Sequence, residues 1–164
     1  MAAGGALLRE LRQAGLSFAA DGERLLAGPP DRLSAATRET IKQYKRELLS
    51  ALLLECLRDD YEERAAIAEC DGGQRRPDAE RLAFETVLAM WLNDAASLPP
   101  IPPAGACPAC TRPLAGDAVP LLRPGAGHLW LHGGCTAMWL RQRKGAGAAA
   151  LAGAGIATPP GWTP

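Results

Sequence analysis

The sequence contains no apolar run that approaches the length of a membrane span, and its N-terminus lacks the basic start, apolar core and cleavage site of a signal peptide. We therefore expect a cytoplasmic protein that does not enter a membrane. The chain also lacks a phosphate-binding glycine motif and a Ser-His-Asp order of any recognised kind. The acidic residues within 59–63 fit the solvated face of a helix. These absences predict a protein that is not an enzyme.

A disulfide framework is not expected, because the five cysteines are odd in number and fit a reducing compartment better. Of the 164 residues, 48% are hydrophobic, which suits one ordinary globular domain or two small ones. Cys56 and Cys70 stand in apolar or helical context, and we expect both to be buried thiols. Arginine far outnumbers lysine and alanine is abundant, as in proteins of high-GC bacteria.

Four soft metal ligands do occur, in two pairs: Cys107 with Cys110, and His132 with Cys135. Each pair encloses two residues, the spacing at which a tight turn or a first helical turn aims both side chains at one tetrahedral centre. Four protein ligands leave no open position, so the pattern predicts a structural Zn²⁺ ion rather than a catalytic one. His128 competes with His132, but the spacing of His132 to Cys135 mirrors the first pair, and we prefer His132.

The segment around these ligands predicts a small zinc-stabilised ββα module over residues 105–145. Short strands are expected at 118–122 and 128–131, and a helix at 136–144. This order of ligand-bearing turn, hairpin and helix resembles treble-clef zinc fingers. Three cations at the end of the helix are candidate nucleic-acid contacts, although cations there also complement the helix dipole: Arg141, Arg143 and Lys144.

Charge is divided unevenly, although the net charge is zero. Residues 1–98 carry 13 Lys or Arg against 17 Asp or Glu, whereas residues 99–164 carry 5 against 1. Three thiolates with one Zn²⁺ contribute a formal charge of about −1, so the C-terminal part stays basic with metal bound. Its charge suits a nucleic acid, an acidic partner or the acidic part of the same chain.

The N-terminal part predicts a helix, a hairpin and a second helix. Apolar residues at helical spacing end at Gly15, and alternation from Leu16 to Ala20 precedes an Asp21-Gly22 turn and a return strand. Ser34 or Thr37 can then cap a helix whose apolar stripe continues to residue 57. With the zinc module, this predicts an α+β chain.

These segments resemble the TubC-type N-terminal docking domain of bacterial nonribosomal peptide synthetases. The resemblance covers residues 5–55 and rests on LREL at 8–11, GL at 15–16, DGERL at 21–25 and KRELL at 45–49. It implies a small αββαα unit, often dimeric, that receives the C-terminal segment of an upstream synthetase by strand addition. By position, the docking edge comprises Arg24, Leu25, Leu26 and Ala27. Only Arg24 is basic there, so reuse of the fold as a dimerisation or interaction unit is the preferred interpretation.

We expect a docking-like domain at 1–57, a helical connector at 58–96, a proline-rich linker at 97–104 and a flexible tail at 146–164, disordered from 158. The connector helix from Pro77 has almost no polar face and should be buried on several sides. Residues 62–67 and 71–73 resemble a short stretch in primase-type proteins of bacterial mobile elements. The whole pattern favours a non-catalytic adaptor that binds a protein or peptide, or a second copy of itself. The alternative is a nucleic-acid-binding accessory protein that acts through the basic zinc module.

Overall fold

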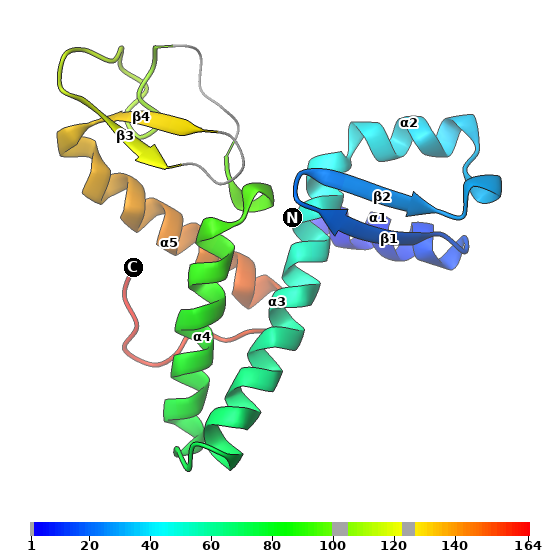
Figure 1. Ribbon diagram of the computed structural model, residues 1–164, viewed down its shortest axis with the longest axis horizontal. Coiled ribbons are helices and arrows are strands. Elements are labelled where there is room, and N and C mark those ends of the chain that lie inside the picture. The colour runs from blue at the N-terminus through cyan, green and yellow to red at the C-terminus, as the bar shows by residue number, and fades with distance from the viewer. Residues whose placement is uncertain (1, 100–104, 123–126) are drawn as a thin grey trace.

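The computed structural model describes residues 2–99, 105–122 and 127–164 (Figure 1). In these ranges the chain forms five α-helices and two separate two-stranded antiparallel sheets, which confirms the α+β class. The elements in chain order are α1 (Ala2–Gln13), β1 (Ser17–Asp21), β2 (Arg24–Gly28), α2 (Ala35–Gln43), α3 (Lys45–Cys70), α4 (Arg76–Asn93), β3 (Ala118–Leu122), β4 (His128–His132) and α5 (Thr136–Gly153). Short 3-10 turns occupy Pro30–Arg32, Ala95–Ser97 and Gly133–Cys135.

The N-terminal unit has the expected order of helix, hairpin and helix. Gly22, with a φ of 57°, takes the first central position of the two-residue turn between β1 and β2, as in a type II′ turn. The Ser34 hydroxyl accepts a hydrogen bond from the Thr37 amide and so caps α2. The single helix expected from there to residue 57 is divided at Tyr44 into α2 and α3. Leucines from α1, the turn after it and α3 form the core of this unit: Leu8, Leu11, Leu16, Leu48 and Leu52.

The expected boundary at residue 57 falls inside α3, which is continuous from the N-terminal unit into the connector. Leu57 belongs to a second core, built where α3, α4 and α5 meet (Figure 1). One side of α4 is buried there, whereas Leu82 and Met90 on its other side are exposed. Cys56 and Cys70 on α3 are also exposed, so the expectation of buried thiols was wrong.

The expectation of a flexible tail over residues 146–164 was also wrong. Helix α5 continues to Gly153, and its second half packs on α3 and α4 through Ala148, Ala150 and Leu151. Beyond the helix, Ile156 is buried in the same core, and the Trp162 ring meets Phe84 edge-on at a centroid distance of 5.5 Å. The small side chains that suggested flexibility instead let α5 approach its neighbours closely.

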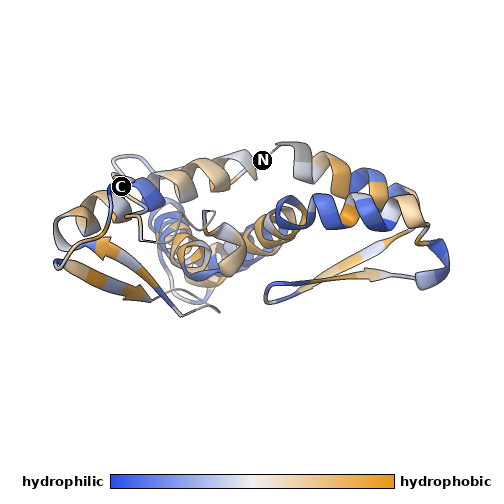
Figure 2. Ribbon diagram, turned by 90° about the horizontal axis from the view of Figure 1, so that it is seen from above, coloured by the Kyte–Doolittle hydropathy of each residue, from blue (hydrophilic) through white to orange (hydrophobic). Residues whose placement is uncertain are grey.

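The two hairpins lie at opposite ends of the molecule with the helices between them (Figure 2). No helix among the described residues has both the length and the apolarity that crossing a membrane demands. The proline-rich linker expected at 97–104 falls mostly outside the described residues.

Candidate metal centre

Two loops and the end of a strand bring the four expected ligands together. Cys107 and Cys110 lie in a turn closed by the hydrogen bond from the Thr111 amide to the Cys107 carbonyl, at 2.7 Å. His132 is the last residue of β4, and Cys135 precedes α5. The ligand atoms of these four residues all lie within 4.8 Å of one another, so the cluster can hold a metal ion.

The distances in the cluster suit a tetrahedral metal. Nδ1 of His132 lies 3.5 Å from Sγ of Cys110 and 3.9 Å from Sγ of Cys135. Metal–sulfur and metal–nitrogen bonds of about 2.3 and 2.0 Å at a tetrahedral angle separate the two donor atoms by about 3.5 Å. The residues present therefore fit an ion at their centre.

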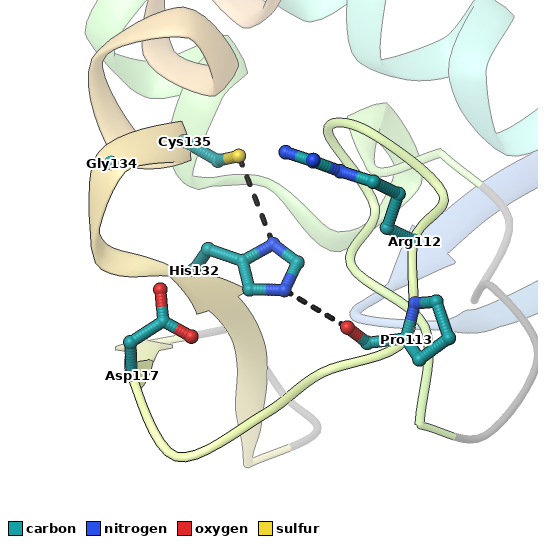
Figure 3. A pocket seen from close by; sticks show the side chains of 6 residues that line it. All are labelled: Arg112, Pro113, Asp117, His132, Gly134 and Cys135. Carbon is teal, nitrogen blue, oxygen red and sulfur yellow. Dashed lines mark hydrogen bonds between the residues drawn. The ribbon is translucent and has the colours of Figure 1, made fainter.

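The Pro113 carbonyl orients the histidine. Nε2 of His132 donates to this carbonyl over 3.0 Å, as Figure 3 shows, which leaves Nδ1 unprotonated and directed at the thiols. A histidine ligand whose second ring nitrogen is held in this way keeps a single tautomer and a single ring orientation. The backbone of the ligand loop thus prepares the imidazole for a metal.

The thiols of the cluster differ in their electrostatic surroundings. A hydrogen bond with the Arg112 guanidinium lowers the pKa of Cys110 to about 6, so that this thiol ionises readily. Burial raises the pKa of Cys135 to about 11. A metal ion that binds here must therefore displace the proton of Cys135, and metal binding is coupled to proton release.

The cluster is also the core of its module. Cys107, Leu131, Cys135 and Trp139 are its buried residues, and they are too few to support a fold by themselves. A hollow beside the cluster is lined by Arg112, Pro113, Asp117, His132, Gly134 and Cys135 (Figure 3). His128 does not join the cluster: its side chain is exposed and its ring lies 6.5 Å from that of Trp130.

The three cations expected to contact nucleic acid do not share one surface. Arg141 and Lys144 are exposed, but Arg143 is buried with 7% of its surface accessible. Its guanidinium donates to the carbonyl and the hydroxyl of Ser97 and lies over the Trp91 ring. Arg143 is therefore unable to reach a phosphate, and the nucleic-acid contact expected for it was wrong. Only the packing of α5 on α4 reveals its role; its position in the sequence carried no signal.

The expected docking edge lies on β2, which pairs only with β1 among the described residues. Arg24 and Leu26 are exposed, whereas Leu25 and Ala27 point toward the helices and are half-buried. Backbone hydrogen bonds alternate in a hairpin closed by a two-residue turn, so Leu26 is bonded to Ala19. The backbone groups of Leu25 and Ala27 consequently face the open edge.

Comparison of the chain with protein-family models, with curated proteins and with solved structures gave no match.

Proposed function

We propose that this protein is a non-catalytic adaptor whose C-terminal module is held by a structural zinc ion and whose N-terminal hairpin binds a second polypeptide. The observation that carries the proposal is the convergence of Cys107, Cys110, His132 and Cys135 on one centre. Three thiolates and one imidazole in a tetrahedral set favour zinc over harder cations. Four protein ligands occupy every position of such an ion, which supports a structural role.

The second half of the proposal concerns the β2 edge. The outward amides and carbonyls of Leu25 and Ala27 can pair with an added strand, as in β-augmentation. A second copy of the same hairpin is the simplest occupant, and a peptide from a partner protein is the other. Helix α3 contributes to the core of this hairpin unit and to the core on which α5 packs. It therefore connects the β2 edge with the metal module, from which α5 continues.

Metal analysis of the purified full chain tests the first half. We expect one zinc per chain and its loss in Cys110→Ser, with no change in Cys70→Ser, since Cys70 is exposed and remote from the cluster. A wild-type protein without stoichiometric metal would contradict the proposal.

A pair of proline variants tests the hairpin edge. Ala27→Pro removes an outward amide of β2 while sparing the bonds to β1, whereas Ala20→Pro removes the equivalent amide from the opposite edge. We expect light scattering to show self-association, or hydrogen exchange to show partner protection of the Ala27 amide. Self-association or partner binding should be lost in Ala27→Pro and kept in Ala20→Pro. A wild-type monomer whose Ala27 amide exchanges freely, with or without candidate partners, would contradict this half.

A further inference from the structure

A charged side chain lies beside the sulfurs of the metal centre without belonging to the ligand set. Arg112 closely follows Cys110 in the ligand loop, and its guanidinium forms a hydrogen bond with the Cys110 thiol. Figure 3 shows the guanidinium extended across the hollow toward Cys135. None of the salt bridges among the described residues involves Arg112. Its charge is therefore directed to the sulfurs rather than to a carboxylate.

The backbone of the ligand loop holds Arg112 in this place. Thr111 takes a left-handed conformation with a φ of 61°, which is uncommon for a residue other than glycine. The chain turns back there, and the Arg112 carbonyl accepts a hydrogen bond from the Cys107 amide over 2.9 Å. Ala106 and Pro113 then pair as an isolated β-bridge. Arg112 is thus anchored to the first ligand by its backbone and placed beside the second by its side chain.

The metal-loaded centre carries a negative charge that Arg112 can offset. Three thiolates, a neutral imidazole and one Zn²⁺ ion sum to a formal charge of about −1. The hydrogen bond with Cys110, followed by the charges of Cys110 and Cys135, raises the pKa of Arg112, so the guanidinium interacts with more than one sulfur. Asp117 lines the same hollow, but its carboxylate has the wrong sign to offset the thiolates.

We infer that Arg112 is a positioning residue of the metal centre, whose guanidinium donates to the Cys110 sulfur and offsets the thiolate charge, and so strengthens metal binding. This inference deepens the proposed function and rests on it, because it requires a metal ion at the four ligands. Groups that hydrogen-bond to metal ligands commonly change metal affinity by about 10- to 100-fold. Because Arg112 is exposed, solvent screens its charge, and we expect the lower end of that range.

Competition with a chromophoric chelator, on the full chain loaded with zinc, tests the inference. Arg112→Gln should weaken zinc binding about 10-fold, because glutamine keeps a polar side chain but loses the charge. Arg112→Lys should recover part of the loss, since lysine keeps the charge without the planar fork of donors. The matched control is Arg141→Gln, which removes an exposed cation of α5 that does not line the hollow and should leave zinc affinity unchanged.

Two further readouts separate a direct contact from a change of fold. With Co²⁺ in place of zinc, the sulfur-to-metal charge-transfer band should move to longer wavelength in Arg112→Gln, because a sulfur that accepts no hydrogen bond gives up electron density more easily. The difference in zinc affinity between wild type and Arg112→Gln should also shrink as the salt concentration rises, since salt screens an exposed charge. Should Arg112→Gln fail to fold, Arg112→Lys carries the same test through a smaller loss of affinity.

The possible outcomes are distinct. Equal zinc affinity in wild type and Arg112→Gln, the same loss in Arg141→Gln, or an unshifted cobalt band would each overturn the inference while leaving the metal centre itself in place. Absence of zinc from the wild-type chain would instead overturn the proposed function, and the inference with it, so metal content is measured on every sample.

Discussion

Arg143 on α5 donates two hydrogen bonds of 2.7 Å to Ser97, one to its carbonyl and one to its hydroxyl. The guanidinium also lies 4.4 Å from the centre of the Trp91 ring on α4. A buried cation is stable only where its donors find acceptors, and the carbonyl, the hydroxyl and the ring face supply that environment together. This contact fastens the helix of the metal module to the end of α4.

Arg143→Ala should therefore destabilise the protein by about 2–4 kcal/mol, because charge-assisted hydrogen bonds and the contact with the Trp91 ring are lost together. Lys144→Ala, at the exposed neighbouring position, should change the free energy of unfolding by less than about 0.5 kcal/mol. Urea denaturation of the two variants measures the difference. Equal stabilities would mean that the Ser97 contact contributes nothing to the fold.

Gly147→Ala should destabilise the protein although alanine is the better helix former. A Cβ atom there would lie 2.6 Å from Cδ1 of Leu88 and 2.8 Å from the Trp91 ring, so α4 and α5 would have to separate, at about 1–3 kcal/mol. Gly145→Ala, where a Cβ atom meets nothing within 4 Å, should stabilise by up to about 1 kcal/mol. Thermal unfolding should give opposite signs for this pair. A stabilised Gly147→Ala variant would refute the close helix packing.

Ile156→Ala should destabilise the protein by about 2–4 kcal/mol, as expected for a residue with only 1% of its surface exposed in a packed core. Thr158→Ala, two residues later and exposed, serves as the control and should have little effect. Denaturant titration followed by far-UV circular dichroism reports both. Identical denaturation midpoints for the two variants would mean that residues after α5 are flexible and do not contribute to the core.

Cys107→Ser should release the metal and unfold residues 105–135, while the helices α1 to α4 persist. The reason is that the binding free energy of such a small module is largely its folding free energy, whereas the other two cores hold no ligand of the cluster. Two-dimensional NMR should show collapsed dispersion for the module alone. Cys56→Ser is the matched control, and global unfolding of Cys107→Ser would show that the module and the helices fold as one unit.

Local patterns predicted the metal ligands and the first hairpin well. A single turn brings Cys107 close to Cys110, and another brings His132 close to Cys135, so the pairing within each pair follows from short-range geometry. The convergence of the two pairs on one centre depends in addition on the β3–β4 hairpin between them. The turn at Gly22 is likewise a property of adjacent residues. Membership of the TubC-type family, zinc as the metal and the adaptor role stay predictions.

By itself, then, the sequence determined the ligand pairs, the strand alternation that turns Trp130 outward and the α+β class, because each depends on residues a few positions apart. Only the tertiary structure decided the environments of Arg143 and Ile156. Both depend on α5 packing against α4, a contact between segments more than fifty residues apart in which Gly147 permits close approach. A run of alanine and glycine carries no periodic signal for such a contact, since its side chains are too small to mark a buried face.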